Sequence, residues 1–155
     1  MQYDWLIIDG YNLLYQEKAL VEQLDCNLQG ACHRLVRHVE ATAHAMAEQT
    51  TIVFDGNSAE RDLALSTKFL EVFFAPSHLS ADSVIERLVC KSPDAVKILV
   101  VTSDYAEQNT VSSAGAHTMS SEEFIERCNQ RKRVPFSHQA SSRKEPKLGD
   151  IFPDN

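Results

Sequence analysis

Short apolar runs alternate with helical repeats along most of the chain. Runs at residues 3–8, 50–54, 70–75 and 96–102 are rich in β-branched and aromatic residues. Each is followed by Asp-Gly, Pro or Ser-Asp, which are typical of the turn that ends a strand. We therefore expect four buried strands in these runs, and a shorter fifth strand around residues 116–118.

Three helices are expected between and after these strands. Apolar residues recur every three or four positions over residues 28–46, with charged residues largely between them. A second helix is predicted to begin at residues 80–82. A capping-box pattern at Ser120 and Glu123 predicts a last helix that ends near Gln130. Apolar strands that alternate with helices are typical of a parallel sheet covered on both faces, so the predicted fold class is α/β.

Length and composition indicate a single globular domain. The chain has 155 residues, of which 43% are hydrophobic. We expect the domain at residues 1–130 and a flexible or partner-dependent tail at residues 131–155, which has three prolines and few apolar residues. No apolar run approaches the ~20 residues of a membrane-spanning helix, and the N-terminus lacks the basic segment of a secretory signal. These features predict a cytoplasmic protein with no membrane partner.

Charge is distributed unevenly between these two parts. Residues 1–130 contain 9 Lys and Arg against 19 Asp and Glu, which gives −10, and residues 131–155 contain 6 against 3, which gives +3. The basic tail is a candidate segment for binding polyanions. An ordinary solvated surface with a frayed end explains the same pattern.

The cysteines do not form a recognisable metal motif. The chain has no C-x-x-C pair. The cysteines and histidines within residues 26–38 are spaced more widely than zinc sites favour and fall on a helical pattern. We expect no zinc site among these residues and interpret the thiols as reduced, in or near the core: Cys26, Cys32, Cys90 and Cys128, with His33 and His38 as the neighbouring histidines.

Four aspartates are predicted to meet at one edge of the sheet. Asp9, Asp55 and Asp104 follow the ends of three predicted strands, and Asp82 lies in the first turn of a predicted helix. In a parallel sheet, ligands bind beyond the carboxyl ends of the strands. Each aspartate alone is ordinary turn or helix-dipole chemistry. Four carboxylates packed together, however, repel one another unless a cation neutralises them.

This pattern predicts metal-dependent phosphodiester hydrolysis. Mg²⁺ and Mn²⁺ bind carboxylate oxygens and commonly retain waters and a substrate phosphate, and such a metal acidifies its water and stabilises charge on a phosphoryl oxygen. Glu86 shares a helix face with Asp82 and is a further ligand, a group that orients water, or a solvated partner of Arg87. Asn12 anchors Asp9 or a water, or stabilises its own turn.

Motifs of other enzyme classes are absent from the sequence. There is no G-x-x-x-x-G-K-[ST] phosphate loop, no G-x-G-x-x-G and no G-x-S-x-G. A phosphatase with a nucleophilic aspartate after the first strand would carry a second carboxylate two positions later. Tyr11 stands at that position.

The segments 7–14 (IIDGYNLL), 53–56 (VFDG) and 81–86 (ADSVIE) resemble, in this order, the YacP-like NYN domain family. Segments at 101–108 and 115–124 extend the resemblance, which covers the body and not the tail. It implies a PIN-like three-layer α/β/α fold with a central parallel sheet of about five strands. It also implies a metal-dependent endoribonuclease, and at least one characterised member acts on messenger RNA associated with ribosomes.

The resemblance also implies roles for individual residues. Asp9, Asp82 and Asp104 correspond to the set that holds one or two Mg²⁺ or Mn²⁺ ions. Asn12 is the polar residue of a D-G-x-N signature, and Asp55 and Glu86 have supporting roles. Because the body is acidic, local basic residues or the tail must contact RNA phosphates; the candidates are Arg61, Lys68, Arg87, Arg131, Lys132 and Arg133.

Two alternative functions stay open at this point. A PIN-like module that binds RNA or a ribonucleoprotein without cutting it would use the same carboxylates as weak metal ligands or as turn residues. A DNA nuclease of related fold is the other alternative, although 155 residues leave little room for elements that bind a duplex. The complete acidic set favours the ribonuclease.

Overall fold

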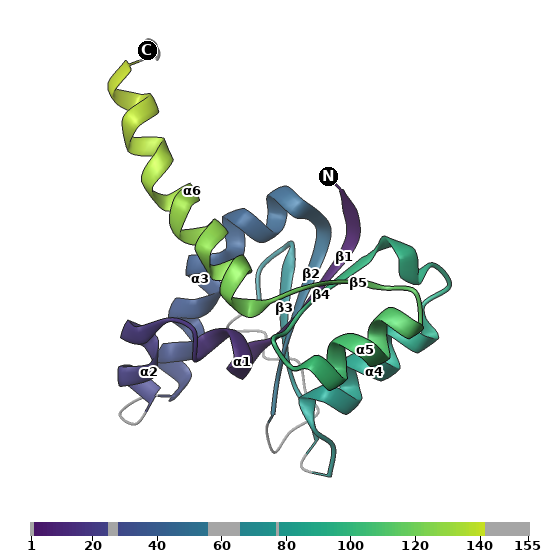
Figure 1. The fold of residues 1–155 in the computed structure, drawn as a ribbon. Helices are drawn as coiled ribbons and strands as arrows, with labels where there is room; N and C mark the ends of the chain where they lie inside the picture. Colours follow the sequence, from purple (N-terminus) through teal and green to yellow (C-terminus); the bar gives the residue numbers. More distant parts are fainter. Residues whose placement is uncertain (1, 25–27, 56–65, 77, 142–155) are drawn as a thin grey trace.

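Five parallel strands form the central sheet of the computed structural model, in the order β3-β2-β1-β4-β5 (Figure 1). The structure describes residues 2–24, 28–55, 66–76 and 78–141. The strands are β1 (Tyr3–Asp9), β2 (Ala47–Phe54), β3 (Leu70–Phe74), β4 (Ile98–Val101) and β5 (His117–Met119). Their number and common direction confirm the expected α/β fold.

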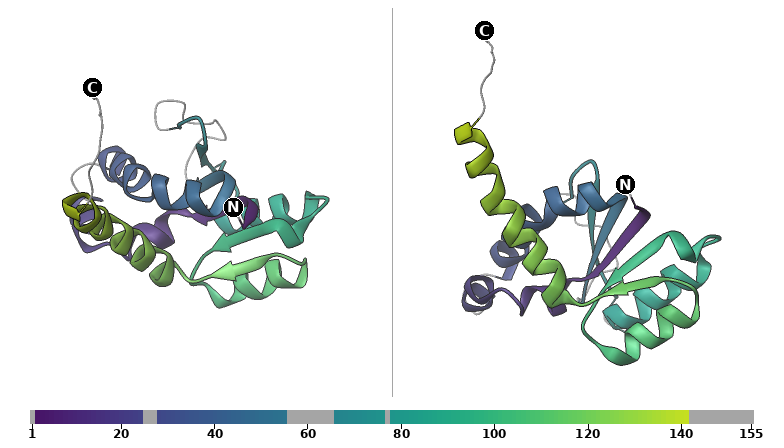
Figure 2. Two further views of the ribbon diagram at one scale, coloured as in Figure 1. Left: turned by 90° about the horizontal axis from the view of Figure 1, so that it is seen from above. Right: turned by 45° about the horizontal axis from the view of Figure 1, so that its top comes forward.

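Helices cover both faces of this sheet (Figure 2). One face packs against α1 (Gly10–Leu14), α2 (Lys18–Leu24), α3 (Leu28–Met46) and α6 (Ser121–Ser141), and the other against α4 (Ala81–Lys91) and α5 (Tyr105–Ser113). None of the helices within the described ranges combines the length and the apolar character that crossing a membrane requires.

The central strand β1 separates the two halves of the core. Side chains alternate along a strand, so Leu6 and Ile8 pack on the α3 and α6 side, and Ile7 packs on the α4 and α5 side. All three are fully buried. By the same alternation, the side chain of Asp9 projects toward α4 and α5. Gly10 lies on the α3 side, against Phe54.

Several element boundaries differ from the sequence expectation. The chain passes from α3 into β2 without a loop, so β2 begins at Ala47 instead of residue 50. A 3-10 turn, η1 (Ala95–Lys97), precedes β4, and Val96 is 55% exposed instead of lying in a buried strand. The apolar pattern does not predict α1, α2 or α5. Helix α5 buries only Glu107 and Val111, so its apolar repeat is weak.

The last helix also continues further than expected. Helix α6 ends at Ser141, not near Gln130. Arginine and lysine favour helices, and no glycine stands between Gln130 and Ser141 to end this one. In Figure 1 its C-terminal half extends beyond the rest of the body. Residues 142–155 of the expected tail lie outside the described part of the chain.

The junction between β1 and α1 has no space for a side chain. A methyl group on Gly10 would overlap the ring of Phe54, which is fully buried.

We therefore expect Gly10→Ala to lower the free energy of unfolding by about 1–3 kcal/mol, as overpacking does in other cores. Urea denaturation measures this change. In a Phe54→Leu background the cost of Gly10→Ala should fall, because the smaller side chain leaves room. An equal cost in both backgrounds would contradict the packing argument.

Candidate metal-binding site

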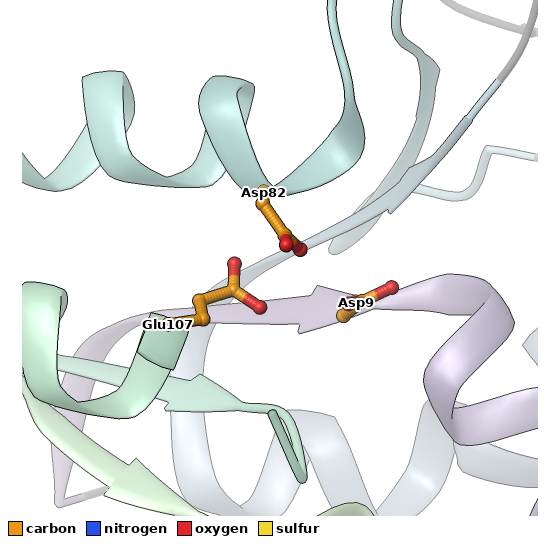
Figure 3. Close-up of side chains that lie close together, drawn as sticks. All are labelled: Asp9, Asp82 and Glu107. Atoms are coloured by element: carbon orange, nitrogen blue, oxygen red, sulfur yellow. The ribbon is translucent and has the colours of Figure 1, made fainter. Parts of the chain in front are cut away.

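Three carboxylates from three elements converge at the carboxyl edge of the sheet (Figure 3). Asp9 ends β1, and Asp82 and Glu107 lie in the first turns of α4 and α5. One oxygen from each carboxylate lies within 4.8 Å of the others. Asp9 is 8% exposed and Glu107 is 1% exposed, and Asp82 is half-buried. Carboxylates placed so closely and so deeply are unusual without a cation.

The N-terminus of α4, which carries Asp82, is fixed by two hydrogen bonds from opposite sides. The Ser80 hydroxyl accepts from the Ser83 amide at 3.1 Å and caps the helix. The Asp55 carboxylate, just after β2, accepts from the Ala81 amide at 2.7 Å. Asp55 therefore does not join the group of three, but it ties the strand end to the residue that precedes Asp82.

Asp104 has a corresponding role at α5. Its Oδ1 accepts from the amide of Ala106 at 2.9 Å and from that of Glu107 at 3.3 Å, which caps the helix. The group of three therefore contains Glu107 and not Asp104, although the charge of Asp104 still affects Asp9. The metal-ligand role that the family resemblance implies for Asp104 stays a prediction.

Asn12 joins three loops at this edge. Its side-chain oxygen accepts from the Ser103 amide at 2.9 Å and from the Ser121 hydroxyl at 2.6 Å, and the Ser121 amide in turn donates to the Ser103 hydroxyl at 3.0 Å. The Asn12 amide donates to Asp9 Oδ1 at 3.4 Å. The residue thus connects the loops that follow β1, β4 and β5, and it contacts Asp9 only through its backbone.

The electrostatics of the site oppose full ionisation of the carboxylates. Burial raises the pKa of Glu107 to about 9, and the charges of Asp82 and Asp9 add to this effect. Burial also raises the pKa of Asp9 to about 7. The hydrogen bond from Asn12 opposes that rise, and the nearby carboxylates of Asp82, Asp55 and Asp104 strengthen it. At neutral pH the group therefore retains protons unless a positive charge replaces them.

These residues fit a hard divalent cation. Neither carboxylate oxygen of Glu107 makes a hydrogen bond of good geometry with the described residues, although both are buried and the side chains of Thr102 and Asp82 lie close to them. Buried oxygens of this kind are normally satisfied, and a cation at the convergence point would satisfy them. A set of three carboxylates suits Mg²⁺ or Mn²⁺, which prefer oxygen ligands.

The other residues predicted from the sequence lie outside this group. Glu86 is half-buried on α4, and Arg87 beside it is exposed. Lys68 precedes β3, at the amino end of the strands and away from the carboxylates, where its ammonium lies 5.6 Å from the centre of the Phe69 ring.

The remaining predicted residues lie on α6 or outside the described part of the chain. Arg131 is exposed on α6. Arg61, Cys26 and the side chains of Lys132 and Arg133 lie outside the described residues. No metal-binding group of cysteines and histidines occurs in the described ranges.

Glu107 is the residue that the sequence pattern did not identify. It stands three residues after the helix-capping Asp104, a position where a glutamate normally serves as part of a helix cap. Its burial in the first turn of a helix with few apolar residues is the signal that distinguishes it. That signal depends on how α4 and α5 pack together, so it is visible only in the structure.

Comparison with known proteins gives the family and the fold. The model of the family described as the YacP-like NYN domain matches residues 6–152. The match therefore includes most of residues 131–155, which the motif resemblance does not cover. No curated protein matches the chain.

Two solved structures of one protein are similar to this chain over most of their length. The first is a crystal structure of a mutant of Rae1 (YacP) from Bacillus subtilis. Its sequence is 25% identical to this chain, the TM-score is 0.68, and the match covers 92% of this chain and 86% of the Rae1 chain. The second is another crystal structure of Rae1 (YacP) from Bacillus subtilis, with 27% sequence identity, a TM-score of 0.62, and a match that covers 88% of this chain and 83% of the Rae1 chain. Family and fold together are those of a ribonuclease-type domain.

The raised pKa values predict how pH affects stability. Without metal, folded Asp9 and Glu107 hold protons that the unfolded chain releases, because the ordinary pKa values are 3.8 and 4.5. In EDTA, the free energy of unfolding should therefore fall as pH rises above these ordinary pKa values. The contribution of Asp9 to this fall should end at about pH 7 and that of Glu107 at about pH 9. Mn²⁺ replaces these protons, so its stabilising effect should grow between about pH 6 and about pH 8. Thermal unfolding with EDTA or Mn²⁺ measures both trends.

Substitution of Glu107 provides the matched test. Glu107→Gln should raise the free energy of unfolding in EDTA at about pH 8 by about 1–3 kcal/mol, because the variant no longer has to protonate, on folding, a carboxyl group that is ionised in the unfolded chain. It should also reduce the gain from Mn²⁺. Glu122→Gln, which changes an exposed carboxylate in the first turn of α6, should alter neither quantity. An undiminished response of Glu107→Gln to Mn²⁺ would count against the site.

Asn12 is expected to be important for stability as well. Asn12→Ala leaves the Ser103 amide and the fully buried Ser121 hydroxyl without their acceptor. We expect a loss of about 1–3 kcal/mol in the free energy of unfolding, measured by urea denaturation. Asn109→Ala, on the exposed side of α5, is the control and should cause no loss. Equal stability of the two variants would show that the three-loop junction is unimportant.

Proposed function

This chain belongs to the YacP-like NYN domain family, and we propose that it is a metal-dependent endoribonuclease. The observation that supports this proposal best is the convergence of Asp9, Asp82 and Glu107 at the carboxyl edge of the sheet. Two of these carboxylates are buried, and both have strongly raised pKa values. Such perturbed groups concentrate at functional sites.

In this proposal Asp9, Asp82 and Glu107 hold Mg²⁺ or Mn²⁺, as one or two ions. When bound, the cation supplies an acidified water and stabilises charge on a phosphoryl oxygen. Asp9 and Glu107 give up the protons that they retain in the metal-free protein. Asp55 and Asp104 act as positioning residues, because their hydrogen bonds hold the helix ends that carry Asp82 and Glu107.

The proposed chemistry determines the product ends. Water attacks the phosphorus, and the ribose 2′-hydroxyl takes no part. Cleavage therefore leaves a 5′-phosphate and a 3′-hydroxyl. The proposed substrate is single-stranded RNA, and the family resemblance extends the proposal to messenger RNA in a ribosome-associated context. Arg87 and Arg131 are exposed candidates for phosphate contacts, and Arg61, Lys68, Lys132 and Arg133 remain candidates from the sequence.

Cleavage of a labelled single-stranded RNA by the full chain tests the proposal. We expect cleavage with Mn²⁺ or Mg²⁺, none in EDTA, and 5′-phosphate product ends. Asp9→Asn, Asp82→Asn and Glu107→Gln should each lower the rate by at least about 100-fold, as loss of a catalytic group commonly does. Glu122→Gln serves as the surface control and should retain the rate of the parent protein.

Each alternative function has its own outcome in this assay. RNA binding without cleavage by a folded protein would favour a binding module. Faster cleavage of a matched DNA oligonucleotide would indicate a DNA nuclease. Cleavage that survives both EDTA and Glu107→Gln would contradict the metal mechanism.

A further inference from the structure

Aromatic side chains form a row at the same sheet edge as the carboxylates. The ring of Phe54, the last residue of β2, lies 5.0 Å between centroids from Tyr11 in an edge-on contact. On its other side it stacks on Phe74, the last residue of β3, at 5.4 Å. Phe54 is fully buried, whereas Tyr11 and Phe74 are only partly buried. The row thus begins at α1, the helix that Asp9 caps, and crosses the ends of two strands on the α3 and α6 side of the sheet, whereas the Asp9 carboxylate projects toward α4 and α5.

Tyr15 continues this row toward solvent. It follows the last residue of α1 with helical backbone angles, one helical turn after Tyr11, so the two side chains lie on the same side. Its amide donates to the Tyr11 carbonyl at 3.0 Å. Tyr15 is 62% exposed, so the core does not account for its large ring. Burial raises the pKa of Tyr11, with smaller contributions from Cys32, Asp55 and Tyr15. The carboxylate of Asp9 caps the N-terminus of α1 through the Asn12 amide, so the helix that contains Tyr11 and is followed by Tyr15 begins at the carboxylate site.

The charge of the neighbouring segments limits how RNA can bind here. Residues 1–17 carry Asp9 and both tyrosines, and residues 98–126 carry Glu107. Neither segment contains a lysine or an arginine. Within these two segments no side chain can form an ion pair with a phosphate, and the nearest cation along the chain from Tyr15 is Lys18, an exposed residue that begins α2. Stacking of bases on aromatic rings needs no positive charge and accepts any base sequence.

We propose that Tyr15, together with the exposed edge of Tyr11, stacks on unpaired RNA bases next to the bond that is cut. This inference rests on the proposed ribonuclease function and names the residues that select single-stranded substrate. A base that is paired in a duplex has no free face for a tyrosine ring. The tyrosines on α1 thus make a strand with splayed bases the preferred ligand.

Binding of a fluorescein-labelled single-stranded RNA, measured by anisotropy, tests the proposal. The measurement uses Glu107→Gln as the parent, so that the RNA stays intact. Adding Tyr15→Ala should weaken binding by roughly 5- to 100-fold, the range for loss of one stacked base. Tyr15→Trp should restore it. The salt dependence of binding should not change, because a stacking residue neutralises no phosphate.

Two controls separate stacking from other effects. Tyr105→Ala removes an 81% exposed tyrosine on α5, two residues before Glu107 and therefore on the far side of that helix, and should bind as the parent does. With an RNA that contains abasic linkers at the contacted positions, the parent and Tyr15→Ala should bind equally. The proposal is wrong if Tyr15→Ala binds intact RNA like the parent, if Tyr15→Trp is as weak as Tyr15→Ala, or if the loss persists on abasic RNA. If the unsubstituted chain cleaves no RNA with Mn²⁺ or Mg²⁺ while binding to the Glu107→Gln parent still depends on Tyr15, the nuclease function alone is refuted.

Discussion

Repulsion among carboxylates in a poorly solvated place is the constraint on which this structure depends. Asp9, Asp82 and Glu107 have ligand atoms within 4.8 Å of one another, and two of the three are buried. A fold tolerates such an arrangement only if protons or a cation offset the charge. The metal-free protein relies on protons, as the raised pKa values of Asp9 and Glu107 indicate. The proposed hydrolytic function uses the same unfavourable charge to hold a metal.

The parallel sheet brings these residues together, and helix caps set their positions. Asp9 is the last residue of β1, whereas Asp82 and Glu107 lie in the first turns of α4 and α5. The hydrogen bonds of Asp55 to Ala81 and of Asp104 to Ala106 and Glu107 connect two strand ends to those helices. Asn12 then ties the loops together. The acidic residues at this edge thus form two groups: Asp9, Asp82 and Glu107 converge, and Asp55 and Asp104 hold the ends of the helices that carry two of them.

The sequence was sufficient to predict the sheet and the edge at which the site lies. Apolar strands that end in Asp-Gly or Ser-Asp are strong local signals, and parallel topology follows from their alternation with helices. It did not indicate that Glu107, in addition to Asp9 and Asp82, belongs to the converging group, whereas Asp104 caps the helix. Both stand at the start of one helix, and only the packing of α4 against α5 decides which carboxylate meets Asp82. The end of α6 was also missed, because a proline-containing basic segment resembles a tail although its backbone continues as helix to Ser141.

A crystal of the full chain soaked in Mn²⁺ tests the central claim most directly, because manganese is identified by its anomalous scattering. We expect an anomalous peak bounded by carboxylate oxygens of Asp9, Asp82 and Glu107, with Asp104 still capping α5. A peak elsewhere, or none at this position with the three carboxylates in the same arrangement, would contradict it.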